Sequence, residues 1–356
     1  METMNEAMQM LDLMVCPAFC VSDQTVLYVN QAARQYLIEP GCPIHTLLET
    51  GTEEYARFQG GCLYLRLKLG TQSCGASVSR MQAWDIFVLE EADQTELQAM
   101  ALAARELREP LSRIMTVADR LQSLACNEDD SAQDQFARMN KGLFQLLRIV
   151  SNMSDAGRYA QNNTSRHQIQ NLTAVMGEIF STASERLSHA QLSVQFSNLD
   201  EPVYSLSDPE KLERAIFNLL SNAAKFTPKG GMISAKLTRR GKMLYLTIED
   251  DGCGVAPELR RNIYSRYLRQ PGLEDSRFGI GLGMVLVRSA AAEHGGTVLI
   301  EYLQDHGTRI TLTLEIRQET GNILHAPALR VDYAGERDHA LMELSDCLPP
   351  SVFKKK

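Results

Sequence analysis

The strongest constraint on the fold is a pair of apolar stripes at helical spacing between about residues 93 and 159. A polar stretch, ACNEDDSAQDQ, separates the stripes and is typical of a loop. The first stripe contains Leu97, Met100, Ala104, Leu107, Leu111, Ile114, Ala118 and Leu121, and the second Phe136, Met139, Leu143, Leu146, Val150 and Met153. Two amphipathic helices joined by a short loop form a helical hairpin, which cannot bury both stripes by itself. The pattern therefore predicts that the hairpin pairs with a second copy.

Length and charge restrict the possible functions. The chain has 356 residues, enough for two or three domains, and a net charge of −8, which would repel nucleic acids and anionic membranes. No apolar run approaches the roughly 18 residues that cross a bilayer. The N-terminal stretch METMNEAMQMLDLM lacks the basic flank of a secretion signal. We expect a cytoplasmic protein with no nucleic-acid partner and no membrane insertion.

The regions on either side of the hairpin mix strands with helices. Before about residue 92, the stretches PAFCVSD, TVLYVN, CLYLRLKLG and AWDIFVLEE are typical of strands, and QAARQYLI of a short helix. Within residues 160–317, MLYLTIEDDG, GTVLIEYL and TRITLTLEI indicate further strands. Residues 318–356 contain no motif that we can interpret. They either pack against the preceding domain, which we favour, or recruit a partner.

Four stretches within residues 160–317 suggest chemistry. The first, LERAIFNLLSNAAKFT, places Asn218 and Asn222 on one face of a helix, and the second, EDDGCGV, follows an apolar strand. The third, FGIGLGMVLV, has glycines before a helix, and the fourth, GTRITLTLEI, begins a strand. An amide oxygen can ligate Mg²⁺, and a carboxylate can accept a hydrogen bond from an adenine amino group. Glycines let backbone N–H groups approach phosphates. Each feature also has a plain alternative: surface asparagines, a packing turn of glycines, and Asp250 as the cap of a turn.

In their order and spacing, these stretches resemble the ATP-binding domain of the histidine kinase, gyrase, Hsp90 and MutL superfamily. Within it, NLLSNAAKFT, DDGCGV, IYSRYLR and GIGLG are most similar to sensor histidine kinases. The resemblance implies an α/β-sandwich domain that binds ATP and Mg²⁺, with Asn222 as the magnesium ligand. It places Asn218 and Lys225 in the same site as catalytic residues, with Lys225 on the phosphate side. The other cofactor-binding residues that it implies are Asp250, which would read adenine, Gly252, Gly254, Tyr264, Tyr267, Gly279, Gly281, Gly283 and Thr308.

The hairpin resembles the dimerisation and histidine-phosphotransfer domain of the same kinases. RELREPL matches the family pattern, with Glu106 among the catalytic residues and Pro110 as a kink that is tolerated despite a usual cost of about 3 kcal/mol. Arg105 occupies the position of the phosphoacceptor histidine. Guanidinium has no acceptor lone pair and stays protonated, so Arg105 should not accept a phosphoryl group. Arg105 either holds the γ-phosphate as a cation or is solvated, and no histidine lies between residues 91 and 166 to replace it.

The first region resembles a PAS domain, through PAFCVSDQTVLYVNQAARQYL. We therefore predict an α+β multidomain protein. Residues 1–92 form a PAS-like sensor domain, 93–159 a hairpin that makes a four-helix bundle as a homodimer or heterodimer, 160–317 the ATP-binding domain and 318–356 a tail. The predicted function is two-component signal transduction with a response regulator or a partner kinase. The alternative is a catalytically inactive, ATP-binding pseudokinase scaffold.

Overall fold

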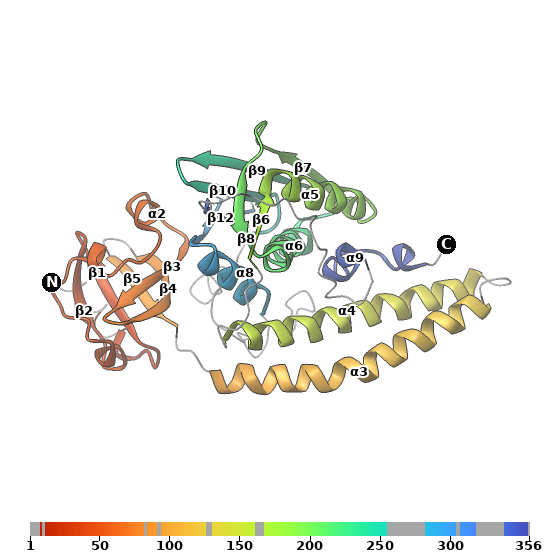
Figure 1. Cartoon of the computed structure of the whole chain (residues 1–356), viewed down its shortest axis with the longest axis horizontal. Coiled ribbons are helices and arrows are strands. Elements are labelled where there is room, and N and C mark those ends of the chain that lie inside the picture. The colour runs from red at the N-terminus through yellow and green to blue at the C-terminus, as the bar shows by residue number, and fades with distance from the viewer. Residues whose placement is uncertain are drawn as a thin grey trace.

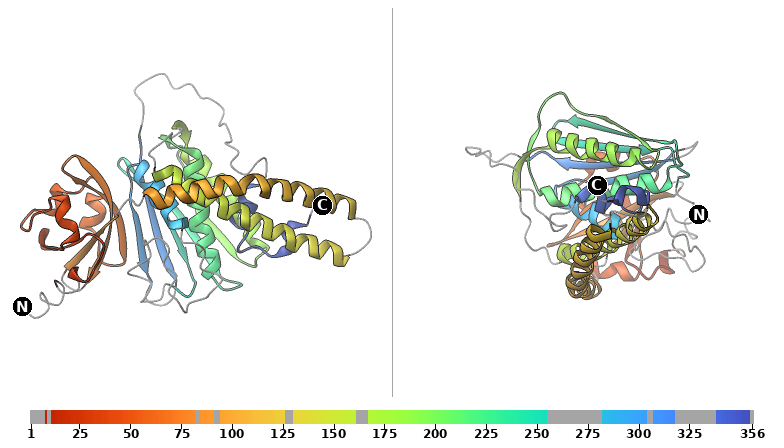
Figure 2. Two further views of the ribbon diagram at one scale, coloured as in Figure 1. Left: turned by 90° about the horizontal axis from the view of Figure 1, so that it is seen from below. Right: turned by 90° about the vertical axis from the view of Figure 1, so that its right-hand side faces the viewer.

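The computed structural model describes Met8 and residues 11–81, 84–90, 94–125, 130–160, 167–254, 282–303, 307–317 and 338–354. An N-terminal domain lies at one end of the molecule, and two long helices run side by side toward the other end (Figures 1 and 2). A second α/β domain lies next to the N-terminal domain and packs along the hairpin (Figure 1). None of the described helices combines the length and the apolar character needed to cross a membrane.

The N-terminal domain is a five-stranded antiparallel sheet with short helices. Its strands are β1 (Ala18–Ser22), β2 (Thr25–Val29), β3 (Cys62–Leu69), β4 (Gln72–Met81) and β5 (Trp84–Leu89), in the spatial order β2-β1-β5-β4-β3. Its helices are η1 (Ala32–Tyr36), η2 (Ile44–Thr46) and α2 (Thr52–Ala56). The core includes Phe19 stacked on Phe87, with ring centroids 4.8 Å apart. Strand β4 was not predicted, because its sequence QSCGASVSRM is too polar to show the alternation of apolar and polar residues that is typical of a strand.

The hairpin consists of α3 (Gln94–Ala125) and α4 (Asp130–Ala160). Helix α3 continues through Pro110, and its ribbon bends along its length (Figure 1). Ala104, Leu111 and Ala118 are buried against α4. Three other residues of the predicted first stripe, Leu107, Ile114 and Leu121, are exposed instead. The large apolar side chains left exposed on the two helices are Leu102, Leu107, Ile114, Val117, Leu121, Met139, Leu146 and Ile149.

The second α/β domain is a layer of helices on one face of a mixed sheet. Its strands are β6 (Gln168–Asn171), β7 (Ser193–Ser197), β8 (Tyr204–Ser207), β9 (Met232–Arg240), β10 (Met243–Asp250), β11 (Val298–Tyr302) and β12 (Thr308–Glu315). Its helices are α5 (Leu172–Ser188), α6 (Pro209–Phe226) and α8 (Leu282–Glu293). The sheet order is β11-β12-β10-β9-β7, and β7 is parallel to β9, while β6 and β8 form a separate pair.

Alternation along β10 decides which side chains face the helices. Leu244, Leu246 and Ile248 are buried in one core with α5, α6 and α8, and Asp250 continues this face. Helix α6 begins after Asp208, whose side chain accepts from the Lys211 N–H, with Pro209 in its first turn. The strand end and the polar side of α6 are therefore brought to one edge of the domain.

The two α/β domains share one continuous sheet, which the sequence did not predict. Edge strands β3 and β11 pair antiparallel, with Cys62 opposite Ile300 and Tyr64 opposite Val298. Arg288 of α8 lies over the Tyr64 ring, 5.2 Å from its centroid, and forms an ion pair with Glu90.

Residues 338–354, called the C-terminal segment below, pack between α4 and α6 (Figure 1). The segment contains α9 (His339–Glu343) and η3 (Pro350–Phe353). Leu344, Leu348 and Phe353 are buried in the core of the second α/β domain, and the Phe353 ring also contacts Phe144 of α4. Of the two alternatives for the tail, packing is the one found for these residues.

Candidate functional site

Helix α6 carries a polar stripe on the side that faces α4, α8 and the C-terminal segment. Asn218 is buried, whereas Asn222 and Lys225 are half-buried. The opposite side of the helix contributes Leu212, Ile216 and other apolar residues to the core. Packing therefore fixes the helix rotation, and the polar stripe has a defined direction.

The two asparagines face the first turn of α8. The Asn218 Nδ2 donates to the Arg214 carbonyl at 2.8 Å, and its Oδ1 accepts from Arg148 Nη2 of α4 at 3.2 Å. A Cβ at Gly283 would lie 2.8 Å from that Oδ1, so only glycine fits there without a shift. The Asn222 amide lies 3.7 Å from the Met284 sulfur.

Asp250, at the end of β10, is a buried carboxylate with a raised pKa. Its side chain is 7% exposed, and its register partner on β12 is Thr308. Burial raises the pKa of Asp250 to about 6, although backbone hydrogen bonds from Gly252 and Thr308 oppose the rise. The Gly252 N–H donates to Oδ1 at 3.0 Å. A buried carboxylate with spare acceptor capacity is suited to a ligand that donates hydrogen bonds.

Glycines around Asp250 let the backbone approach it closely. A Cβ at Gly252 would lie 2.7 Å from both Asp250 Oδ1 and the Phe226 carbonyl oxygen. Gly254 and Gly307 adopt φ values of +68° and +98°, which favour glycine. Because Phe226 ends α6, the contact with Gly252 joins the Asp250 loop to the end of the helix that carries Lys225.

A network of charges covers the polar stripe of α6. Lys225 Nζ and Arg148 Nη1 each lie 2.7 Å from Asp346 of the C-terminal segment. Glu343, fully buried, lies 3.3 Å from Arg148 and 3.2 Å from Arg214. Arg214 also forms an ion pair with Asp155 of α4. Sequence reasoning missed this network, because its members come from three regions and only their packing brings them together.

Burial acts on Asp346 to raise its pKa, but Arg148 and Lys225 outweigh burial, so the pKa lies below its ordinary value. Asp346 is therefore a carboxylate at neutral pH.

Comparison with known proteins identifies the domain that carries this site. The family model described as histidine kinase-, DNA gyrase B- and HSP90-like ATPase matches residues 207–318. These residues match this ATPase family, and the second α/β domain is called the ATPase domain below. The match includes α6, β10, α8 and β12, and it covers all the described residues of the site except Arg148, Asp155, Glu343 and Asp346.

Two of the similar curated proteins are named as histidine kinases. Histidine kinase P4 of Formosa agariphila is 25% identical over 232 residues, which cover 64% of this chain and 17% of that protein. Sensor histidine kinase WalK of Bacillus subtilis is 24% identical over 244 residues, or 66% of this chain and 39% of WalK. The chain thus spans less than half the length of either relative.

Among solved structures, full-length ShkA in complex with AMPPNP aligns with a TM-score of 0.50 at 20% identity. The alignment covers 63% of this chain and 46% of that chain, and it supports the fold alone.

The hairpin residues of the prediction, Glu106 as a catalytic residue and Arg105 at the phosphoacceptor position, both lie on α3. Arg105 and Glu106 are exposed on α3. Neither side chain forms an ion pair or a hydrogen bond within the part of the chain that the structure describes. The Arg105 side chain is therefore exposed in this structure, and both interpretations of it stay predictions. The predicted cofactor-binding residues Tyr264, Tyr267, Gly279 and Gly281 lie outside the described residues.

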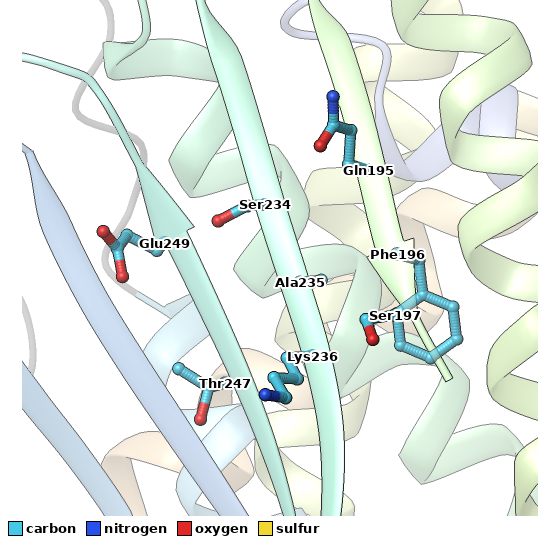
Figure 3. A pocket seen from close by; sticks show the side chains of 8 residues that line it. All are labelled: Gln195, Phe196, Ser197, Ser234, Ala235, Lys236, Thr247 and Glu249. Atoms are coloured by element: carbon cyan, nitrogen blue, oxygen red, sulfur yellow. The ribbon is translucent and has the colours of Figure 1, made fainter. Parts of the chain in front are cut away.

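The ATPase domain also has an open groove of about 440 Å³ on the outer face of its sheet (Figure 3). Ser234, Lys236, Thr247 and Glu249 line it, with residues 195–197 of β7. Since Thr247 and Glu249 alternate with Ile248 and Asp250 along β10, the groove lies on the face opposite to the buried carboxylate. It is therefore separate from the site built on α6.

Proposed function

We propose that the chain binds ATP with Mg²⁺ between α6, α8 and the Asp250 loop, and that it acts in two-component signal transduction. The proposal rests on the close packing around Asp250. The Gly252 N–H donates to the Asp250 carboxylate, and Gly252 packs against the end of α6 beside Lys225. A buried, hydrogen-bonding carboxylate selects the adenine amino group, and a cation two helical turns from Asn218 suits phosphate oxygens.

The donor set fits ATP-Mg²⁺. Asn222 would hold the metal through its amide oxygen, as Mg²⁺ takes a few protein oxygens and keeps phosphate oxygens and waters. Lys225 would bind phosphates, and Asp250 the adenine, with Thr308 beside it. Gly252, Gly254 and Gly283 give the ligand close access to backbone. Bound ATP supplies the phosphoryl group; the protein's part is to position that group and to balance its charge.

The hairpin and the N-terminal domain support a signalling role. The exposed apolar residues of α3 and α4 favour a four-helix bundle formed with a second hairpin, in a homodimer or a heterodimer. The strand order β2-β1-β5-β4-β3, with short helices after β2, supports a PAS-like input domain. A response regulator or a partner kinase would receive the signal, and location in the cytoplasm stays a prediction.

Because Arg105 stands at the phosphoacceptor position, the proposed function has two possible forms. As a solvated guanidinium it accepts no phosphoryl group, so transfer requires a histidine of a partner kinase. The second candidate is a pseudokinase scaffold that binds ATP without transferring phosphate. It is favoured by the exposed position of Arg105, whose side chain forms no ion pair with the polar stripe of α6 among the described residues.

Two measurements test the proposal. Calorimetry with ATP, ADP and AMP in the presence of Mg²⁺ should give saturable heats with ATP, and Asn222→Ala should lose the Mg²⁺-dependent part. No heat with any adenosine phosphate would overturn nucleotide binding.

Incubation with γ-labelled ATP, alone and with a candidate partner kinase, then separates transfer from scaffolding. Acid-labile label on a histidine of the partner supports transfer, and no label despite ATP binding supports the scaffold. We expect Arg105→His to create acid-labile label on residue 105. If this variant folds and binds ATP but gains no label, the hairpin and the ATPase domain are not arranged for transfer.

A further inference from the structure

The phosphate end of the proposed site already holds an anion that belongs to the chain. Asp346 of the C-terminal segment lies 2.7 Å from Lys225 Nζ and 2.7 Å from Arg148 Nη1. Gln145 of α4 also donates to Asp346, at 3.1 Å. One carboxylate thus bridges the ATPase domain and the hairpin through two cations and an amide.

The cations around Asp346 form a built site with restricted access to solvent. The side chain of Arg148 is 6% exposed and that of Lys225 is 11% exposed, whereas that of Asp346 is 30% exposed. The carboxylate is therefore the most accessible member of the cluster. It is held at the site because α9 and the apolar residues that follow it are anchored in the ATPase core.

Arg148 extends the site beyond the matched ATPase domain. It comes from α4 of the hairpin, outside residues 207–318, yet it donates to Asn218 of the polar stripe at 3.2 Å. The same guanidinium therefore touches a residue of the proposed nucleotide site and the anion bound there. A planar guanidinium with several donors is well suited to phosphate oxygens as well as to a carboxylate.

We propose that Lys225 and Arg148 form one anion-binding site, which Asp346 and the terminal phosphates of ATP occupy in turn. The docked C-terminal segment then lowers the affinity for nucleoside triphosphates, and its release provides two cations to the phosphates. The inference rests on the proposed nucleotide binding and adds to it a phosphate-binding residue from the hairpin and a built-in competitor. Adenosine lacks phosphates, so its binding should not depend on Asp346.

The first test compares ATP and adenosine on full-length variants. Asp346→Asn should tighten ATP binding about tenfold, because a hydrogen bond to a charged group is worth roughly 1.5 kcal/mol or more. It should leave adenosine binding unchanged. The matched control, Asp200→Asn, makes the same change at an exposed position away from the site and should affect neither ligand.

The outcomes separate this inference from the function on which it rests. ATP affinity that is equal in the wild type and in Asp346→Asn would overturn the competition, while ATP binding itself stands. An equal gain for adenosine and ATP would also overturn it, since the effect would not concern phosphates. No binding of either ligand to any variant would overturn both proposals.

A second test holds the segment in place reversibly. Ser221 Oγ of α6 and Cys347 Sγ lie 3.8 Å apart, so Ser221→Cys places two thiols side by side. Oxidised glutathione can accept their two electrons and join them in a disulfide, which peptide mapping would verify. ATP affinity should fall on oxidation and return with dithiothreitol. Unchanged affinity in the verified disulfide form would contradict the proposal.

Discussion

The two ends of the proposed nucleotide site are built in different ways. At the adenine end, Asp250, Gly252 and Gly307 are set by backbone contacts within the ATPase domain, including the Gly252 N–H donated to the Asp250 carboxylate. At the phosphate end, Asn218 and Lys225 have charged partners from α4 and the C-terminal segment. The described residues of the first end all come from one domain, whereas those of the second come from three parts of the chain.

This difference shows where regulation can act. At the adenine end, the pairing of Asp250 on β10 with Thr308 on β12 holds the backbone, and it can be broken only by local unfolding. Ion pairs at the phosphate end can be exchanged for other anions, because a carboxylate and a phosphate satisfy the same donors. The adenine end is therefore suited to constant recognition, and the phosphate end to control by a neighbouring element.

The largest expected effect comes from Glu343, the fully buried residue that holds the C-terminal segment to both Arg148 and Arg214. Glu343→Gln removes one charge from a buried network and should lower the free energy of unfolding by about 3 kcal/mol, because the remaining cations lose compensation. Urea unfolding followed by circular dichroism would measure the change.

Glu213 provides a matched control for Glu343. It also contacts the segment, through His339 at 3.3 Å, but its side chain is 29% exposed. Glu213→Gln should cost less than about 1 kcal/mol, as partly exposed pairs contribute little. Equal losses in the two variants would show that the phosphate end is not held by its buried charges.

The next effect tests the adenine end. Asp250→Asn should weaken ATP binding by roughly 10- to 100-fold, since it replaces a charge-assisted hydrogen bond worth about 1.5–3 kcal/mol. The same variant should raise the Tm of the unliganded protein at pH 7.5, because it removes a carboxylate whose burial raises its pKa. Calorimetry and thermal unfolding would measure the two changes. A variant that binds ATP as well as the wild type would remove Asp250 from the site.

Sequence patterns indicated the local geometry around Asp250 better than the ion pairs around Lys225, for a physical reason. The Asp250 loop is local in sequence, so its motif DDGCGV contains both the carboxylate and the glycine that must approach it. The helix α6 and the strands β10, β11 and β12 were also predicted, since their apolar periodicity is regular. Ion pairs between α4, α6 and residues 338–354 depend on tertiary packing, and no short pattern encodes them.

Two other features could not be predicted from the sequence, for related reasons. Pairing of β3 with β11 joins two sheet edges through backbone atoms, which leave little trace in side-chain patterns. Strand β4 alternates small and polar residues that are as common in loops. The C-terminal segment did carry a signal, because ALMELSDCL places apolar residues on one side and acids at positions 343 and 346, but the partners of these acids could not be read from it.

A smaller effect is expected in the pH dependence of ATP affinity, which should differ between the two ends of the site. The Asp250 pKa of about 6 means that the carboxylate becomes protonated as pH falls from 7.5 to 5. Because the neutral acid is a poorer acceptor for the adenine amino group, ATP affinity should fall about tenfold over this range. Asp346 has a lowered pKa and stays ionised, so it should contribute no change. Calorimetry at several pH values would show the fall, and Asp250→Asn should abolish it.

The smallest effect is expected at Arg105, which lies on the exposed face of α3 with no ion pair among the described residues. Arg105→Ala should change the free energy of unfolding by no more than about 0.5 kcal/mol, as is usual for exposed positions. It should leave ATP affinity unchanged, because this side chain has no hydrogen bond or ion pair to the described residues at either end of the site. Urea unfolding and calorimetry on the same preparation would measure both quantities. A loss of ATP affinity with intact stability would instead place Arg105 on the γ-phosphate. The phosphate end would then include α3 as well as α4, and solvent exposure would describe only the conformation in which the C-terminal segment is docked.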